Sequence, residues 1–449
     1  MACVIHGATI LDGVRDHAIE GHSIWIEGAR IKAIVRRGEL VESVQDKVID
    51  ADGKYVIPGL MNANVHLMTG SSLEDLVRHE GRYEELIAEA AQIALKMGLT
   101  TIFDTWGPRR PLLAVRNRIN AGELPGSRLF CGGNIIGLDG PLSADFYPKA
   151  AEVASPELVN RVNSAWTENV GPALTWMTPE QVAKEVRAYI GTGVDFVKYA
   201  ASEHVVPLGN TAFLAFSPNS QVAIVEEAHH AGLIAQAHTQ SVEAVRVAAE
   251  AGCDLIQHVN ITGPVPLPEE TFSLLAQRKT ACTVFPLTQR RYKWTMEQGG
   301  AVMRRIFSEA TAQTNVANLV RSGLTLLLAT DGGLWSPGNP ELDIDVNRAD
   351  DLFDLRTGHI SWFKAMEEMG MAPMRALQAA TRNIAVAYGK GADLGTLEPG
   401  KIADLLVLSG NPLESADHYR SIQLIMKDGL VVDREILPLK PVLTASRIP

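Results

Sequence analysis

Cysteine is scarce in this chain of 449 residues, and its spacing excludes several classes of protein. The four cysteines, Cys3, Cys131, Cys253 and Cys282, lie far apart and form no CxxC pair. A secreted disulfide scaffold and a zinc ribbon both need closely spaced cysteines. We therefore expect reduced thiols in a cytoplasmic protein.

An excess of basic residues and long apolar runs are also lacking. The formal net charge of −11 disfavours binding to the phosphate backbone of nucleic acids. No stretch is long and apolar enough to span a membrane, and the first residues do not combine a basic segment with an apolar run, as a secretory signal would. We expect neither a nucleic-acid nor a membrane partner.

Both ends of the sequence contain short strands with tight turns. Residues 23–26, 30–35, 48–50 and 55–57 are strand-like, and Asp52-Gly53 predicts a hairpin between the last two. Residues 403–408 and 422–426 are similar, and Asp428-Gly429 predicts a second hairpin. Neither end has enough apolar surface to form a domain alone, so we expect both to pair in one small β-sandwich domain.

Between these ends, helices and apolar strands alternate. Predicted helices 86–97, 179–190, 220–231, 242–251 and 315–322 precede predicted strands 98–104, 193–198, 233–238, 254–258 and 324–328. Repeated units of this length indicate an α/β fold, and their number favours a (β/α)8 TIM-like barrel. The predicted domains are residues 1–58 and 390–449 for the two parts of the β domain and 59–389 for the barrel.

Residues of metal-ligand type follow or end several predicted strands. In Asn64-Val65-His66, the first and third side chains share one strand face. Lys198, His238, His258 and Asp331 end other strands, and strand ends of a parallel barrel open onto one face. Each has a structural alternative: a polar strand end, a salt-bridged lysine, or a helix N-cap for Asp331. Their convergence favours a site.

The chain resembles the amidohydrolase superfamily over nearly its whole length, and three segments carry the resemblance. They are Val56-Ile57-Pro58-Gly59-Leu60-Met61-Asn62-Ala63-Asn64-Val65-His66, Gly98-Leu99-Thr100-Thr101 and Gly395-Thr396-Leu397-Glu398-Pro399-Gly400-Lys401-Ile402-Ala403-Asp404-Leu405. The usual family motif ends in His-x-His, whereas this chain has Asn64 at the first position. In that respect it resembles the subgroup containing phenylurea and molinate hydrolases.

The resemblance implies a divalent metal, zinc or cobalt, and a set of residues that bind it. The implied ligands are His66, Lys198 carboxylated by CO2, His238, His258 and Asp331, and Asp331 would also transfer protons. An amide oxygen is a weaker donor to zinc than imidazole. We therefore expect one tightly bound ion on the His238–His258 side, with Asn64 a weak ligand or a hydrogen-bonding residue outside the metal shell.

Other residues receive less specific interpretations. Trp106, Phe216, Trp294 and Trp335 follow or flank barrel strands and are candidates to line an apolar substrate site, although each is individually typical of a core. Tyr199, next to Lys198, is a candidate for a substrate hydrogen bond. Four further histidines receive no metal role: His204, His229, His230 and His359.

The predicted function is metal-dependent hydrolysis of an amide-like C–N bond, or of a thiocarbamate C–S bond. The substrate is expected to be a small, largely apolar urea, carbamate, thiocarbamate or anilide. Two alternatives stay open: a prolidase-like dipeptidase, which would need a cationic partner for the substrate carboxylate, and a binding protein that has lost catalysis. Assembly into a homo-oligomer is expected from the resemblance alone.

Overall fold

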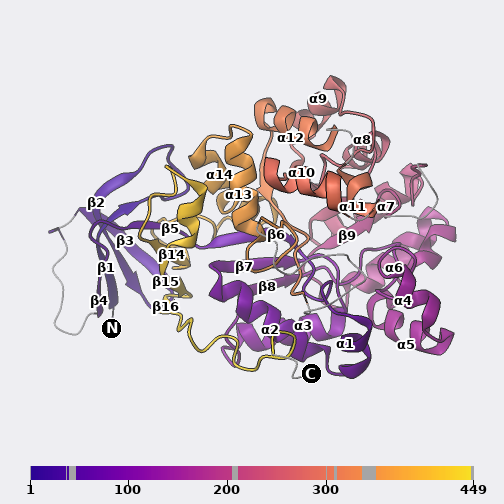
Figure 1. Ribbon diagram of the computed structural model, residues 1–449, viewed down its shortest axis with the longest axis horizontal. Coiled ribbons are helices and arrows are strands. Elements are labelled where there is room, and N and C mark those ends of the chain that lie inside the picture. Colours follow the sequence, from indigo (N-terminus) through magenta and orange to yellow (C-terminus); the bar gives the residue numbers. More distant parts are fainter. Residues whose placement is uncertain are drawn as a thin grey trace.

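The computed structural model describes residues 2–36, 38–39, 47–204, 211–299, 301–307, 311–335 and 350–445. Figure 1 shows a sheet at one end of the molecule and a larger body of strands and helices beside it. Two separate clusters of buried apolar side chains correspond to these regions. The α/β class predicted from the sequence is therefore confirmed.

The sheet has eight strands and draws on both ends of the chain. The N-terminal part supplies β1 (Ala2–Ile10), β2 (Ile19–Glu27), β3 (Arg30–Arg36), β4 (Lys47–Asp50) and β5 (Tyr55–Pro58). The C-terminal part supplies β14 (Leu405–Leu408), β15 (Ile422–Lys427) and β16 (Leu430–Val431). The order is β16-β15-β14-β5-β1-β2-β3, with β4 also paired to β1. Antiparallel pairing of β5 with β14 joins the two ends, as predicted.

One predicted hairpin is confirmed and the other is wrong. Asp428 and Gly429 adopt positive φ of 53° and 74° between the antiparallel strands β15 and β16, which is the backbone that a tight hairpin turn requires. By contrast, β4 and β5 do not pair with each other around Asp52-Gly53. Both pair in parallel with successive parts of β1, so the turn only interrupts one extended path.

The larger body contains eight parallel strands in two sheets. One sheet has the order β6-β7-β8, formed by β6 (Leu60–Val65), β7 (Leu99–Asp104) and β8 (Arg128–Cys131). The other has the order β13-β12-β11-β10-β9, formed by β9 (Val197–Ala200), β10 (Ala235–His238), β11 (Leu255–Gln257), β12 (Ala281–Val284) and β13 (Leu326–Leu328). Isolated parallel bridges, Val65 with Gly332 and Ile136 with Tyr199, connect their edges. Strands β8 and β12 were not predicted.

Helices surround these strands in Figure 1. They are α1 (Leu73–Arg78), α2 (Tyr83–Lys96), α3 (Arg109–Asn120), α4 (Pro148–Val153), α5 (Pro156–Thr167), α6 (Pro179–Ile190), α7 (Pro218–His230), α8 (Val242–Glu250), α9 (Glu269–Arg278), α10 (Gln289–Gln298), α11 (Ala301–Ile306), α12 (Thr311–Ser322), α13 (Gly358–Glu368), α14 (Pro373–Ala379) and α15 (Arg382–Ala387), with 3-10 helices η1 (Pro172–Trp176) and η4 (Ala416–Arg420).

Local sequence signals account for where several of these helices begin. Ser155, Thr178 and Ser217 cap α5, α6 and α7 through their side-chain oxygens, and a proline follows each cap. This order suits a helix start because the capping oxygen accepts an otherwise unpaired backbone N–H, while proline needs no N–H partner. None of the helices in the described ranges combines the length and apolarity that crossing a bilayer requires.

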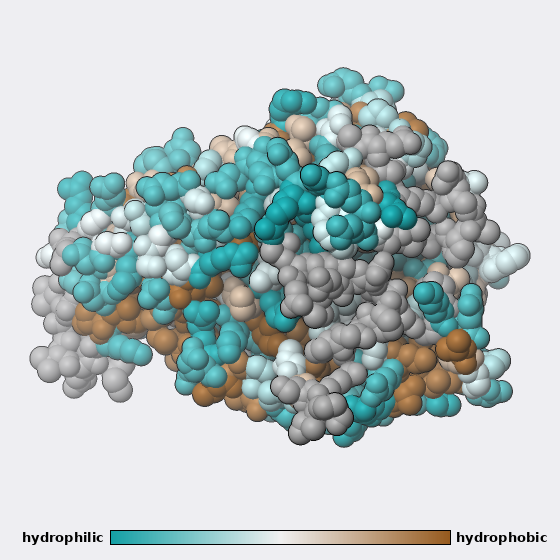
Figure 2. Space-filling model, viewed as in Figure 1, coloured by the Kyte–Doolittle hydropathy of each residue, from teal (hydrophilic) through white to brown (hydrophobic). Residues whose placement is uncertain are grey.

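The C-terminal segment after β16 returns to the larger body along α2. The Glu89 carboxylate of α2 accepts hydrogen bonds from the backbone N–H groups of Val442, Leu443 and Thr444. Figure 2 shows a mostly hydrophilic surface in this view, with apolar residues along its lower edge. Exposed large apolar residues of this part of the chain are Leu430, Val431, Ile436 and Leu439. The domain boundaries predicted from the sequence remain predictions.

Candidate metal centre

The five residues predicted as main ligands lie on parallel strands or just after them. Contrary to the prediction, Lys198 does not end its strand but is the second residue of β9. Lys198 lies within β9, His238 ends β10, and His66 and His258 directly follow β6 and β11. Asp331 comes three residues after β13. His66 Nε2 is 3.5 Å from Asp331 Oδ1, and the His238 and His258 ring centroids are 4.6 Å apart. The strands therefore place these side chains in two neighbouring pairs, His66 with Asp331 and His238 with His258, while the roles of all five residues remain proposals.

Backbone geometry explains how two of these residues reach the centre. His258 has φ +38° and Asp331 has φ +48°, in the left-handed region that residues other than glycine adopt uncommonly, although Asn, Asp and His do so more often than others. On a regular strand, Gln257 and His258 would face opposite sides. The left-handed turn at His258 breaks that alternation. Backbone strain of this kind is concentrated at functional sites.

The backbone of β6 is attached to the segment after β13. The Asn64 carbonyl accepts hydrogen bonds from the backbone N–H groups of Thr330 and Asp331, at 3.2 and 3.0 Å. The His66 N–H donates to the Gly332 carbonyl at 3.0 Å. These bonds fix the main chain of His66 relative to Asp331.

Lys198 is buried, with 1% of its surface exposed. Its Nζ donates a hydrogen bond to Thr105 Oγ1 at 3.0 Å, and the Thr105 hydroxyl donates to Asn64 Oδ1. Asn64 Nδ2 donates to Gln257 Oε1 at 2.8 Å. Asn64 is fully buried, and both ends of its amide have protein partners. Thr105 and Gln257 were not identified from the sequence.

The three strand-end histidines are held in the neutral form. Burial is the largest cause that lowers the pKa of His66, His238 and His258 well below the ordinary value. The positive charge of Lys198 lowers all three further. Neutral imidazole has a lone pair available for a metal, whereas imidazolium does not.

Lys198 and Asp331 are shifted in the directions that burial imposes. Burial lowers the pKa of Lys198, although the charges of Asp331 and Asp104 raise it. Burial raises the pKa of Asp331, while Lys198 lowers it. In both groups, burial disfavours the charged form. A partly neutral amine is the form that reacts with CO2.

Asp104 is a further buried acid near this centre that the sequence did not single out. Burial raises its pKa to about 8, against the opposing effects of hydrogen bonds from backbone N–H groups and the charge of Lys198. Its carboxylate accepts from the N–H of Leu67 and of Trp106. Asp104 therefore ties the segment after His66 to the end of β7. Its position as the last residue of a predicted strand was the available signal.

The donor set fits a divalent cation if Lys198 takes part. His258 Nδ1 and Asp331 Oδ1 are buried and have no hydrogen-bond partner within the described ranges. Such orphaned donors and acceptors are costly unless something binds them. Among the residues that the structure describes, no three His, Cys, Asp or Glu side chains converge as a metal site. Two imidazoles, Asp331 and a carboxylated Lys198 supply the nitrogen and oxygen donors that zinc prefers.

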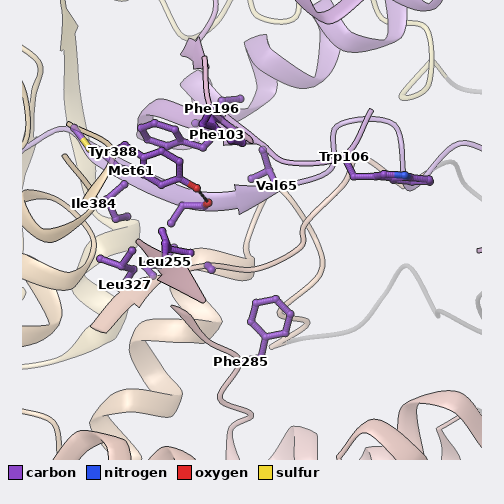
Figure 3. Close-up of a cluster of buried hydrophobic side chains, with 14 of the residues drawn as sticks. Met61, Val65, Phe103, Trp106, Phe196, Leu255, Phe285, Leu327, Ile384 and Tyr388 are labelled. Atoms are coloured by element: carbon purple, nitrogen blue, oxygen red, sulfur yellow. Dashed lines mark hydrogen bonds between the residues drawn. The ribbon is translucent and has the colours of Figure 1, made fainter. Parts of the chain in front are cut away.

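Aromatic rings form a continuous series of contacts beside these residues. Trp106 lies 5.8 Å from His66, centroid to centroid, and stacks on Phe146 at 3.8 Å. Phe146 stacks on His204 at 4.6 Å, and on the other side Phe285 lies 5.2 Å from His258. Figure 3 shows Trp106 and Phe285 projecting from separate parts of the ribbon. Trp106 therefore lies beside a candidate ligand, while its predicted role in lining an apolar substrate site remains a prediction.

The other predicted substrate contacts are not all brought to the centre. Tyr199 alternates with Lys198 on β9, and its hydroxyl donates to Gln221 of α7, so it faces the helices. We therefore withdraw Tyr199 as a substrate contact. The ring of Phe216 lies against Gly137, where an added Cβ would come within 2.5 Å of it. Trp335 follows Asp331 and donates to the Phe353 carbonyl. Roles for Phe216 and Trp335 remain predictions.

Trp294 and three of the other histidines lie apart from the candidate ligands. The Trp294 ring lies against the Arg291 guanidinium, 4.6 Å away. His229 and His230 are exposed on α7, as expected of surface residues. His359 is buried in α13, and burial lowers its pKa to about 4.

His204 lies closer to the centre than the sequence indicated. Its Nδ1 is 3.0 Å from the Asp145 carbonyl, and its ring centroid is 5.1 Å from that of His238. Burial is the main cause that lowers the pKa of His204 to about 4. A neutral ring that donates through Nδ1 leaves Nε2 as a hydrogen-bond acceptor.

A cavity of about 680 Å³ lies elsewhere, among residues of α3, α5 and α6. The Arg109–Glu168 ion pair is part of its lining, and none of the predicted site residues contributes to it. Its volume alone does not make this cavity the site, because the ligand-type side chains lie on the parallel strands or just after them and not in its lining. We therefore build the site from the strand-end residues.

Comparison with known proteins identifies relatives over the whole chain. Residues 55–432 match the model of the amidohydrolase family. The solved structure of molinate hydrolase is 34% identical, covers 100% of this chain and 98% of its own, and superposes with a TM-score of 0.95. Phenylurea hydrolase B is 33% identical over 99% of this chain and 100% of its own, with a TM-score of 0.94.

A more distant relative by sequence acts on another compound. Ochratoxinase from Aspergillus niger is 26% identical over 373 residues, which cover 80% of this chain and 71% of that protein. The named activities therefore differ among relatives that share the fold.

Proposed function

This chain belongs to the amidohydrolase family, and on that premise we propose that it is a metal-dependent hydrolase of a small, largely apolar urea, carbamate, thiocarbamate or anilide. The observation that supports the proposal is the placement of His66, Lys198, His238, His258 and Asp331 on parallel strands or just after them, with His66 beside Asp331 and His238 beside His258. The similarity to molinate hydrolase and phenylurea hydrolase B supports the substrate class.

The metal site that we propose is built from His238, His258 and Lys198, with His66 and Asp331 beside it. A bound zinc or cobalt ion would polarise the substrate carbonyl and lower the pKa of water. We expect Lys198 to be carboxylated, because burial favours its neutral, nucleophilic amine. One tightly bound ion per chain is expected, since Asn64 supplies only a neutral amide where the family usually has an imidazole.

Asp331 is the proposed proton-transfer residue. As a carboxylate it accepts a proton from the attacking water, and as an acid it donates that proton to the leaving nitrogen or sulfur. Its raised pKa suits a group that must both take up and release a proton near neutral pH. The histidines cannot replace it, because burial keeps them neutral and the metal would occupy their lone pairs.

The surroundings favour an apolar substrate that carries a hydrogen-bond donor. Trp106, Phe146 and Phe285 offer ring faces and edges beside the histidines. Neutral His204 would accept a substrate N–H through Nε2. Ureas and anilides with an N–H can use that acceptor, whereas a dialkyl thiocarbamate has no such donor. Among the classes above, we therefore rank N–H-bearing ureas and anilides first.

The two alternatives lack support from particular residues. A dipeptidase would need a cation for the substrate carboxylate, but the two buried arginines within the described ranges, Arg109 and Arg291, already face Glu168 and Asp351. A protein that had lost catalysis would have no reason to keep His258 Nδ1 and Asp331 Oδ1 buried without hydrogen-bond partners.

We propose that the eight parallel strands close into a (β/α)8 barrel. The two isolated bridges at the sheet edges support closure, because they join β6 to the segment after β13 and β9 to the segment after β8. We also propose that residues 1–58 and 390–449 form the small β-sandwich domain around residues 59–389, and that the chain forms a homo-oligomer.

A panel of substrates tests the proposed function. Purified enzyme loaded with zinc or cobalt is incubated with a phenylurea, an anilide, a dialkyl thiocarbamate and an Xaa-Pro dipeptide. We expect turnover of the phenylurea or anilide to exceed that of the dipeptide by at least a hundredfold in kcat/KM. Preferred cleavage of the dipeptide would contradict the substrate class, and no turnover with any of them would favour the binding protein.

A further inference from the structure

The interior polar residues below the metal centre form one continuous chain of hydrogen bonds. From Lys198 Nζ it passes through Thr105 and Asn64 to Gln257. Gln257 Nε2 donates to Gln236 Oε1, and Gln236 Nε2 donates to the Tyr388 hydroxyl at 3.1 Å. The chain ends where Tyr388 donates to the Ala63 carbonyl at 2.6 Å.

Every donor in this chain points away from Lys198. The Ala63 carbonyl can only accept, so the single Tyr388 hydroxyl proton is directed to it. Tyr388 must then accept from Gln236, which orients the amides of Gln236, Gln257 and, through them, Asn64. The Asn64 oxygen therefore faces Thr105, and the one Thr105 proton is used on Asn64. Thr105 is left to present its lone pairs to Lys198 Nζ and to His66 Nδ1, which lies 3.3 Å from the same oxygen.

Tyr388 anchors this chain from outside the barrel strands. It follows α15, it is 4% exposed, and its ring stacks on Phe103 with centroids 3.7 Å apart. Figure 3 shows Tyr388 beside Phe103, away from Trp106 and Phe285. The anchor is thus held by core packing, independently of any ligand at the strand ends.

A branch of the chain reaches a second proposed ligand. The Thr283 hydroxyl donates to Gln257 Oε1 at 2.8 Å and accepts from the backbone N–H of His258 at 2.6 Å. This contact holds the backbone of His258, whose own left-handed φ turns its side chain toward the centre. Gln257 therefore connects the Asn64 amide to the backbone of a ligand.

We propose that Thr105 is a positioning residue for Lys198, and that Asn64 acts on the metal centre through Thr105 and not as a metal ligand. This inference rests on the proposed metal dependence. Asn64 replaces the usual histidine because its short amide spans Thr105 and Gln257, accepting from one and donating to the other. Without the Thr105 hydroxyl, Lys198 Nζ loses the hydrogen bond that it donates within the described residues, and His66 Nδ1 loses its contact with the same oxygen.

Matched valine and serine variants test the inference by metal binding and not by turnover. Thr105→Val keeps the shape and removes the hydroxyl, whereas Thr105→Ser keeps the hydroxyl. The control is Thr101→Val on β7, the strand that ends directly before Thr105, because the buried Thr101 hydroxyl has no partner within the described ranges. Zinc content after dialysis and zinc affinity by competition with a chelator are measured for all four proteins, including the wild type.

We expect Thr105→Val to bind zinc at least tenfold more weakly, the scale for residues that support a metal ligand. Thr105→Ser should lie within about threefold of wild type, and Thr101→Val should not differ from it. Wild-type affinity in a folded Thr105→Val protein would overturn the inference while leaving the proposed function intact. A wild-type protein that binds neither zinc nor cobalt would overturn the proposed function itself.

A crystal structure of the zinc-loaded wild type decides the matter if the valine variant does not fold. The inference expects Asn64 Oδ1 outside the metal shell and bonded to Thr105. An Asn64 oxygen within about 2.2 Å of the ion, the usual zinc–oxygen distance, would overturn it.

Discussion

Replacing Asp331 by asparagine separates the chemical role of this residue from its structural role. Asparagine has nearly the same shape and is among the residues that tolerate a left-handed backbone, so it suits the φ of +48° at this position. Alanine would be a poorer choice because it adds backbone strain. The substitution removes only the ability to accept and return a proton.

We expect two effects of Asp331→Asn, one on the rate of hydrolysis and one on the stability of the fold. Loss of a positioned proton acceptor lowers kcat by about 10²–10⁴-fold, equivalent to an increase of about 2.7–5.4 kcal/mol in the activation free energy of the reaction. Stability should change in the opposite direction. Burial raises the pKa of Asp331 in the folded protein, despite the attraction of Lys198. As pH rises above the unfolded-state pKa, the Asp331 carboxyl therefore ionises more readily in the unfolded chain, and the wild type loses stability.

The assay therefore has a kinetic and a thermodynamic part. Turnover of the best substrate is compared for metal-loaded proteins, and denaturant unfolding is measured on metal-free proteins at pH 5, 6.5 and 8. We expect the variant to be the more stable protein, by a margin that widens from pH 5 to pH 8. Turnover within a few-fold of wild type would refute the proton-transfer role. A margin that shrinks or reverses with pH would refute the burial argument.

Other predictions concern single side chains. His238→Ala and His258→Ala should each lose bound metal and activity. The control His230→Ala, on the exposed face of α7, should keep both. Full metal content in His238→Ala or His258→Ala would contradict the ligand set. Lys198→Ala should lose activity, and short carboxylic acids should restore part of it by replacing the carbamate; normal metal content and turnover would exclude a ligand role. His359 is 1% exposed and its pKa is lowered to about 4, so the metal-free wild type should lose stability as pH falls from 6.5 towards 4, by up to about 1.4 kcal/mol per pH unit from this residue. His359→Leu should show a pH slope that is smaller by that amount, and an unchanged slope would contradict it.

The placement of the candidate ligands on parallel strands could be predicted because two simple rules apply. Apolar strands before Lys198, His238 and His258 are evident in the sequence, and parallel strands open at one end. The same rule predicts that successive residues face opposite sides, so Tyr199 could have been rejected beside an inward-facing Lys198.

Other features depend on contacts that no local pattern reveals. β8 and β12 have four residues each, and their sequences, Arg-Leu-Phe-Cys and Ala-Cys-Thr-Val, carry little signal. The prediction of a hairpin at Asp52-Gly53 was wrong because β4 and β5 each pair with the long strand β1 and not with each other. The series of hydrogen bonds from Thr105 to Tyr388 joins residues far apart in the sequence, and its last bond, from Tyr388 to the Ala63 carbonyl, spans 325 positions.

Metal counting coupled to activity tests the central claim most directly. The protein is stripped with a chelator, dialysed, and titrated with zinc or cobalt while hydrolysis of a phenylurea or anilide is followed. The account predicts no turnover in the stripped protein, and recovery that saturates at one tightly bound ion per chain. Full turnover by metal-free protein would contradict the proposed chemistry, and saturation only at two ions per chain would contradict the role assigned to Asn64.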